Sequence, residues 1–476
     1  MPSSVTAGAR VALEFSPDAA MLERAIAALD ESDEQGGAVA PDARRAALER
    51  YAGLPAPGAR PGKSWRYDYA SLDFAGLTWS SARQPIAALQ GLAQAQRPGL
   101  TQAQRPGLSQ AQRVDDDASA DNLWTANAGG LIHIGATVLE PRETPQLDPR
   151  VTVLPLADAL RTHADVIAGI LHATVGFQSD RYAALTTAFQ NCGAFVFVPS
   201  GVQLDEPIVL VFASAPDPTA VFPQVVVVLG EGARATVLER HIGEAESFVC
   251  ATVEAHVGAR AQLDYVVVQQ APESARVIAT RVARCDPQAT MRWHLAELGA
   301  GLARTSLETR LEGEGSDARI DALFFNTGMQ HVDLSTAVRH ETGHTTSGTI
   351  VRSAANDRGQ GRYLGNIIIL PHAHGSDASL RDDALLLSKR AHIDSIPALE
   401  IAANDVKAFH GATVGSIDDE QLFYAQSRGI GRGEAERMIA LGFFEPAITH
   451  FPSEALRNEV RSALDAKLDD ATERHA

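Results

Sequence analysis

The chain has 476 residues, of which 45% are hydrophobic and 21% are charged, the composition of an ordinary soluble globular protein. Its 41 Lys and Arg residues against 59 Asp and Glu residues give a formal net charge of -18, which opposes general binding to nucleic acid or anionic membranes because phosphate contacts need clustered cations. The longest apolar runs have the length of strands, so we expect neither a nucleic-acid partner nor a membrane partner.

Residues 1–85 are predicted to form a helical segment that ends in an extended docking arm. SPDAAMLERAIAALDES has apolar residues at helical spacing, with Ser16 as the expected N-cap and Pro17 at the first helical position. PDARRAALERYAGL is a second expected helix, and aromatic residues alternate in the arm GKSWRYDY. The GKS of this arm lacks the upstream glycine of a phosphate loop, because Pro57 stands there. We therefore expect no ATP hydrolysis.

Residues 86–150 are predicted to be a linker with a low-complexity insert. An eight-residue repeat runs through residues 91–113 as GLAQAQRP, GLTQAQRP and GLSQAQR. A Pro-Gly step interrupts the repeat and prevents a continuous helix. We interpret this insert as a surface loop.

Residues 151–400 are predicted to form a β-rich core that begins with short helices. Strand-like runs are separated by turns, and the short pattern of GARA recurs in looser forms. Stepping along one position of this pattern, from Ala235 to Ala261, Ala289 and Ala318, gives intervals of 26 to 29 residues. A drifting period of this size favours stacked β coils, and a β-sandwich remains an alternative.

Residues 401–476 are predicted to return to short helices. Ser416 and Asp419 form an S-x-x-D capping pattern before IDDEQLFYAQSR. Acidic residues fill the expected first turn, where the helix dipole stabilises negative charge. Two further amphipathic segments, EAERMIALGFFEPAI and SEALRNEVRSALDAKL, follow this helix.

The sequence HETGH matches the zinc-binding pattern H-E-x-x-H at His340, Glu341 and His344. That pattern needs a helix, which brings the two histidines onto one face. The surrounding Thr and Gly residues favour a strand or a turn instead. A zinc-dependent hydrolase that uses these three residues is therefore the weaker alternative.

The cysteines and the first residues favour a cytoplasmic protein. Cys192, Cys250 and Cys285 are too widely spaced for a disulfide framework or a CxxC metal site. Cys285, which lies at a turn, is expected to be the most exposed of the three. The segment MPSSVTAGARVALEFSPDAA lacks the pattern of a secretory signal.

Several stretches together resemble one known family. They are LLLSKRAHIDSIPALEIAANDVKAFHGATVGSIDDEQLFYAQSRGI followed by EAERMIALGFF, with support from GAFVFVPSGVQLDEPI, HVDLSTAVRHETGHTTS and GKSWRYDY. In these motifs the chain is similar to the SufB/SufD family of iron–sulfur cluster assembly proteins, and it resembles the SufD branch more closely.

This resemblance implies a mainly β fold, with a right-handed parallel β-helix core between helical N-terminal and C-terminal segments. It also implies a non-catalytic scaffold subunit that pairs with a SufB-like protein through the β-helix. A SufC-like ATPase would dock on the C-terminal helical segment, and a homodimer of the isolated chain is left open. The expected partner-docking residues are Asp418, Asp419, Glu420, Gln421, Phe423, Tyr424 and Arg428.

The resemblance singles out His410 in KAFHGATVG as a candidate cluster ligand. Many family members have a cysteine two positions earlier, whereas this chain has Ala408. One neutral imidazole is a good iron ligand but does not hold a cluster alone. We therefore expect no cofactor in the isolated chain and a transient cluster shared with the SufB-like partner. Glu400 is a candidate second-shell carboxylate, and a purely structural role of His410 is the alternative.

Overall fold

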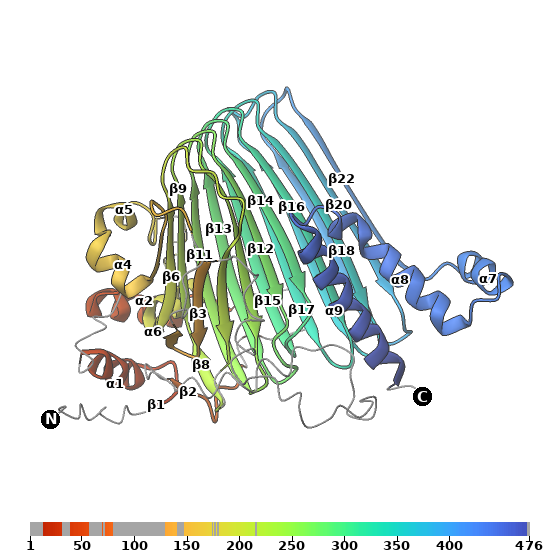
Figure 1. Ribbon diagram of the computed structural model, residues 1–476, viewed down its shortest axis with the longest axis horizontal. Helices are drawn as coiled ribbons and strands as arrows, with labels where there is room; N and C mark the ends of the chain where they lie inside the picture. The colour runs from red at the N-terminus through yellow and green to blue at the C-terminus, as the bar shows by residue number, and fades with distance from the viewer. Residues whose placement is uncertain are drawn as a thin grey trace, which may run out of the picture.

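The protein folds into a β-solenoid with helices at its N-terminal and C-terminal ends (Figure 1), which confirms the expected mainly β class. The computed structural model describes residues 13–30, 39–56, 69, 72–79, 129–139, 147–173, 175, 178, 180–214 and 217–473. The eight-residue repeat and most of the predicted docking arm lie outside these residues.

Two sheets form the walls of the solenoid. Sheet A contains β1 (Leu13–Glu14), β2 (Thr78–Trp79), β5 (Thr152–Pro155), β6 (Cys192–Val198), β8 (Thr219–Val221), β9 (Pro223–Leu229), β11 (Ser247–Val257), β13 (Arg276–Cys285), β15 (Leu302–Leu311), β17 (His331–His340), β19 (Gln360–Ile369) and β21 (His392–Ile401). Sheet B contains β3 (Gly129–Ile134), β4 (Thr137–Leu139), β7 (Ile208–Ala213), β10 (Arg234–Ile242), β12 (Gln262–Gln269), β14 (Thr290–Glu297), β16 (Asp317–Asn326), β18 (Thr346–Ala355), β20 (Asp377–Leu386) and β22 (Lys407–Ser416).

From β10 onward the chain alternates between the sheets, so that each coil supplies one strand to each wall. Neighbouring coils pair in parallel, and Ala235 lies opposite Leu263, which in turn lies opposite Met291. Each of these steps is 28 residues, as the drifting period predicts. The predicted partner of Ala235 was Ala261, two residues away from the true one, because the small-residue pattern belongs to the turn before each strand.

Alternation along each strand separates the interior of the solenoid from its outer faces. In β19, QGRYLGNIII, every second residue from Gly361 to Ile369 is buried. The inward side chains of both sheets form one continuous apolar core, which includes Val237, Met291, Leu334 and Leu380. Strands of the solenoid begin at β3 and end at β22, and so reach beyond both ends of the range 151–400 predicted for the core.

Helices of the N-terminal half cover one outer surface. They are α1 (Ala19–Asp30), α2 (Pro41–Gly53), α4 (Leu156–Thr162), α5 (Ala164–Ala168) and α6 (Arg181–Phe189). α1, α2 and α6 share a core with Phe248 and Ile278, which are outward residues of sheet A. The predicted cap of α1 was wrong, because the backbone N–H of Met21 donates to the side chain of Asp18, and Ser16 precedes the helix.

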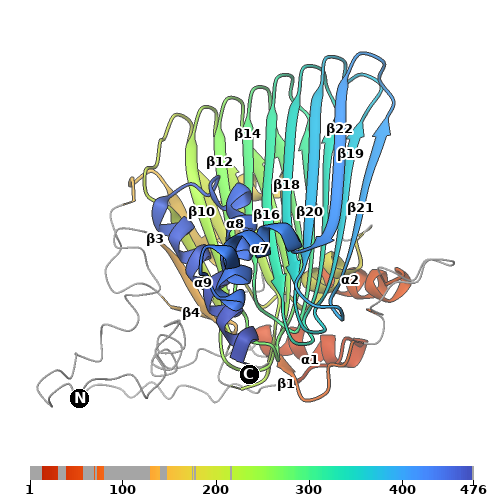
Figure 2. The same ribbon diagram turned by 90° about the vertical axis from the view of Figure 1, so that its right-hand side faces the viewer.

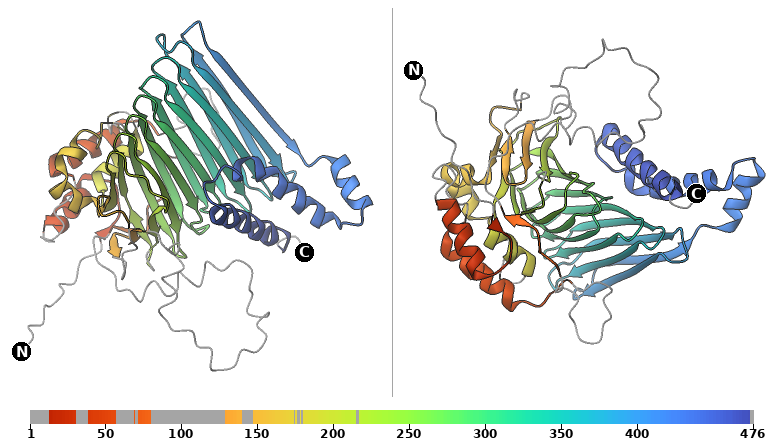
Figure 3. Two further views of the ribbon diagram at one scale, coloured as in Figure 1. Left: turned by 45° about the horizontal axis from the view of Figure 1, so that its top comes forward. Right: turned by 90° about the horizontal axis from the view of Figure 1, so that it is seen from below.

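The C-terminal helices are α7 (Asp419–Ser427), α8 (Arg432–Ile448) and α9 (Glu454–Glu473). α8 and α9 lie along the outer face of sheet B and bury Phe444, Phe451 and Val460 against outward residues such as Phe325 (Figure 2). α7 stands away from the solenoid at its far end (Figure 3). Within the described ranges, no helix combines the length and the apolar character needed to cross a membrane.

Candidate functional site

The last coil of the solenoid leaves an open edge on both sheets. Among the described residues, β21 pairs only with β19, and β22 pairs only with β20. Large apolar side chains are exposed along this edge, including Phe409 (63%), Val414 (46%) and Ile401 (44%). Unpaired strands with exposed apolar residues are templates for pairing with another chain. The edge therefore has the properties of an interaction surface.

His410 lies in β22 at this edge. It pairs in register with Leu380, whose side chain belongs to the core between the sheets. His410 therefore projects from the inner face of sheet B, yet it is exposed because no further coil covers it. No group of three His, Cys, Asp or Glu side chains within the described part of the chain is placed to hold a metal ion.

Glu400 lies in β21, on the other sheet and on its outer face. Its neighbours along the strand, Leu399 and Ile401, pair in register with the core residues Ile367 and Ile369 and so occupy the inner face. The side-chain amide of Asn366 donates a 2.7 Å hydrogen bond to Glu400 Oε1. The structure thus places Glu400 outside the solenoid and His410 on its inner side, and it does not bring the two together.

A different carboxylate, Asp382 in β20, shares the inner face with His410. Burial raises the pKa of Asp382 to about 7, although the hydroxyl of Ser395 donates a hydrogen bond to its Oδ2. The sequence analysis missed this residue. Its signal is the alternation in DASLRDDALL, where Asp382 falls in phase with the buried residues Ala378, Leu380 and Ala384.

The predicted docking residues occupy α7 and its cap. The side chain of Asp418 accepts a 2.9 Å hydrogen bond from the backbone N–H of Glu420, so Asp418 is the N-cap. The predicted capping residue Ser416 instead ends β22. Leu422 and Ala425 are buried against the start of α8. All seven predicted docking residues are exposed: Asp418, Asp419, Glu420, Gln421, Phe423 (73%), Tyr424 (62%) and Arg428.

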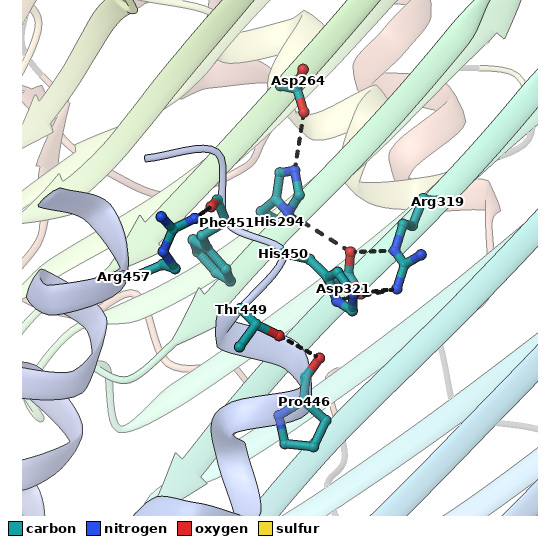
Figure 4. Close-up of polar contacts among 9 residues, drawn as sticks. All are labelled: Asp264, His294, Arg319, Asp321, Pro446, Thr449, His450, Phe451 and Arg457. Atoms are coloured by element: carbon teal, nitrogen blue, oxygen red, sulfur yellow. Dashed lines mark hydrogen bonds and ion pairs between the residues drawn. The ribbon is translucent and has the colours of Figure 1, made fainter. Parts of the chain in front are cut away.

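A polar network fixes the turn between α8 and α9 on sheet B (Figure 4). On the sheet, His294 Nε2 lies 3.3 Å from Asp264 Oδ1, and its Nδ1 lies 3.9 Å from Asp321 Oδ2. The turn contributes His450, whose Nδ1 lies 2.9 Å from Asp321 Oδ1, and Phe451, whose ring packs on His294. Both Asp321 and His294 are buried, so the helical pair rests on a specific contact as well as on apolar packing.

The HETGH sequence forms one of the turns between coils. His340 ends β17, and His344 lies in the turn before β18 with φ 57°. Arg260 and Gln288 take the same left-handed conformation at matching turns of earlier coils, with φ 59° and 60°. Both ring nitrogens of buried His340 contact hydroxyls, Thr345 Oγ1 at 2.8 Å and Ser347 Oγ at 2.9 Å. The helix that the zinc pattern requires is replaced by a strand end and a turn.

The three cysteines are all free and buried. The expectation that Cys285 is exposed was wrong, because it is the last residue of β13 and points into the core. Burial raises the pKa of its thiol, and it raises that of Cys250 to about 12. A buried protonated thiol is a poor nucleophile and a poor metal ligand.

Two family models match the sequence. Residues 211–443 match the model described as "SUF system FeS cluster assembly, SufBD core domain", and residues 132–210 match "SufBD protein N-terminal region". These ranges contain the solenoid strands from β5 to β22. The family expected from the sequence motifs is confirmed.

Individual relatives agree with the family models. The chain is 33% identical to the iron–sulfur cluster assembly protein SufD of Escherichia coli over 242 residues, which are 50% of this chain and 57% of that protein. It is 27% identical to SufD of Bacillus subtilis over 327 residues, 67% of this chain and 75% of the relative. It is 26% identical to SufB of Bacillus subtilis over 299 residues, 62% and 64% of the two chains.

The match to Escherichia coli SufD and that to Bacillus subtilis SufB each span less than two thirds of the relative. The two family models, in contrast, adjoin each other and extend through the last coil into α8. On this evidence the chain is a SufD-like member of the SufB/SufD family of iron–sulfur cluster assembly proteins.

Proposed function

We propose that this protein is a non-catalytic scaffold subunit of an iron–sulfur cluster assembly complex. It pairs with a SufB-like protein through the open edge of the solenoid, and a SufC-like ATPase docks on its C-terminal helices. The cluster is the product of the complex and not a resident cofactor of this chain. It forms transiently where His410 meets the partner.

The observation that carries this proposal is the exposed inward histidine on an unpaired edge strand. A strand from a partner that pairs with β22 would cover His410 and add its own side chains to the site. This chain supplies no thiolate there, since Ala408 stands two positions before His410 and all three cysteines are buried elsewhere. Neutral imidazole binds iron well, so His410 would provide one ligand and the partner would provide the others.

The exposed face of α7 supports docking of the ATPase. Phe423 and Tyr424 are solvent-exposed large aromatics, and Arg428 stacks over the Tyr424 ring at 5.1 Å. Exposed aromatics beside an arginine are typical of the residues that dominate binding energy at protein interfaces. α8 joins this surface to sheet B, so movement of a bound ATPase would act directly on the solenoid.

Replacement of His410 by alanine in the reconstituted three-protein complex tests the proposal. The complex should assemble as before, because the side chain is exposed, and the yield of iron–sulfur cluster should fall several-fold. His392→Ala is the matched control, since His392 lies on the neighbouring edge strand and contacts Asp394 at 2.7 Å. An unchanged cluster yield in His410→Ala would leave His410 with a structural role only.

A further inference from the structure

The interior of the last two coils holds a polar atom that the fold leaves unpaired. Asp382 has 0% exposure, and its Oδ1 has no hydrogen-bond partner among the described residues. Only the other oxygen, Oδ2, accepts a hydrogen bond, from Ser395 on β21. Buried carboxylate oxygens are normally satisfied, because leaving one without a donor costs free energy. An unpaired one therefore calls for a donor that arrives in another state of the protein.

His410 is the nearest candidate donor by strand geometry. Leu380 pairs with His410, and Asp382 pairs with Ala412, so the two side chains lie on the same inner face of adjacent strands and two residues apart. With strands spaced about 4.8 Å apart and a rise of about 3.3 Å per residue, their Cα atoms are separated by about 8 Å. The residue beside Asp382 on β22 is Ala412, whose methyl group leaves room for an imidazole ring to turn inward.

We propose that Asp382 is a positioning residue for His410. It accepts a hydrogen bond from one ring nitrogen of His410 and thereby directs the other nitrogen toward iron at the partner interface. This inference rests on the proposed function, because it assigns a role to Asp382 through His410. The exposed imidazole needs only a change of rotamer to reach the buried oxygen.

The chemistry of histidine ligands explains why such a carboxylate matters. A neutral imidazole has one protonated and one unprotonated nitrogen, and only the unprotonated one binds a metal. A carboxylate that accepts the N–H fixes the tautomer and the ring orientation, and it makes the ligating nitrogen more basic. Loss of such an outer partner typically lowers metal affinity about 10- to 100-fold.

Binding of Co²⁺, used as a spectroscopic substitute for Fe²⁺, to the metal-free three-protein complex tests the proposal. We expect Asp382→Asn to weaken Co²⁺ affinity about tenfold or more and to shift the visible absorption bands, while Asp382→Glu restores part of the affinity. Asp377→Asn is the matched control, since Asp377 is an exposed carboxylate on the outer face of the same strand. It should bind Co²⁺ as the wild-type complex does.

A second variant guards against misfolding of the Asp382 variants. Ala412→Leu keeps both polar side chains and fills the space between them at an exposed position, so it should weaken Co²⁺ binding in the same way. Wild-type binding by either Asp382→Asn or Ala412→Leu, with weakened binding by His410→Ala, would overturn this inference alone. Wild-type binding by His410→Ala would overturn the proposed cluster site and the inference together.

Discussion

At the scale of single residues, the solenoid interior contains a charged cluster around Glu239. Arg281 NH2 lies 2.5 Å from Glu239 Oε1, and Tyr265 donates a 2.5 Å hydrogen bond to Oε2. His241 Nε2 contacts Oε1 at 2.6 Å. Burial opposes the charged form of Glu239, but the charge of Arg281 and these hydrogen bonds outweigh it and hold its pKa well below the ordinary value. The carboxylate thus stays ionised in an apolar core.

Removal of the cation should expose the cost of that buried charge. Arg281→Met leaves Glu239 without its neutralising partner, and we expect a loss of about 3–5 kcal/mol in the free energy of unfolding, measured by urea denaturation at neutral pH. The double variant Arg281→Met/Glu239→Gln should recover part of this loss. Equal stability of the single variant and the wild type would show that the pair does not stabilise the fold.

Asp382 should make stability depend on pH in the opposite direction to an ordinary carboxylate. Its pKa is raised from 3.8 to about 7, so between these values the folded state binds more protons than the unfolded state. The free energy of unfolding should therefore fall as pH rises from about 4 to about 7, by on the order of a few kcal/mol in total. Urea unfolding in the presence of a chelator should show that Asp382→Asn removes this fall. A parallel pH profile of the two proteins would contradict the assignment.

At the scale of elements, the C-terminal helices are an integral part of the solenoid. Lys467 of α9 donates 2.6 Å hydrogen bonds to the backbone oxygens of Leu298 and Phe325 on sheet B. Phe444 of α8 is completely buried and packs near Phe325. These contacts give α8 a fixed position, which a helix must have if a protein bound to α7 is to act on the sheet.

Truncation of Phe444 tests how firmly α8 is anchored. Phe444→Ala should lower the free energy of unfolding by about 3–5 kcal/mol, because it leaves a cavity between the helix and sheet B. Met438→Ala on the same helix is the control, since Met438 is exposed, and it should change stability by less than about 0.5 kcal/mol. Similar effects of both variants would mean that α8 does not depend on this contact.

At the scale of the whole molecule, the solenoid is asymmetric. Its first coils are covered by α1, α2 and α6, whereas its last coil ends in the two open edges of β21 and β22. Apolar side chains remain exposed at that end alone among the solenoid strands, apart from the turn residue Met329 (73%), within the described residues. This asymmetry predicts that the chain associates with other proteins through its last coil.

A charge placed on the open edge should block association without unfolding the chain. Lysine on an edge strand opposes strand pairing because its charge would be buried. We expect Val414→Lys to reduce complex formation with the SufB-like partner, and any homodimer of the isolated chain, at least tenfold by size-exclusion chromatography and light scattering. Met329→Lys, which is remote from the edge, should associate normally. Normal assembly of Val414→Lys would place the interface elsewhere.

The period of the solenoid was predictable because each coil repeats the same physical problem. A turn of small residues must precede every strand, so GARA and its variants mark Arg260 and Gln288 as turn positions. The pairing partner of Ala235 was not predictable to the residue, since turn and strand lengths vary from coil to coil. The same turn rule explains His344, whose place in HETGH is set by the coil and not by a metal.

The candidate site was predictable in part. His410 was found through the motifs that surround it, and α7 through its acidic start. The capping residue was missed because Ser416 is needed by β22, and Asp382 was missed because its neighbour His410 lies 28 positions away in sequence. Only strand register places two such residues on one face.

The sequence by itself determined the β-rich core, its coil period, the family and the C-terminal helices, because these depend on local patterns of burial, turns and caps. The tertiary structure alone decided which side chains meet. It separated Glu400 from His410, buried Cys285 and brought Asp382 beneath the open edge. These outcomes depend on pairing between strands about 30 residues apart, for which local physical chemistry fixes the spacing only approximately, whereas a shift of one residue exchanges the inner and outer faces.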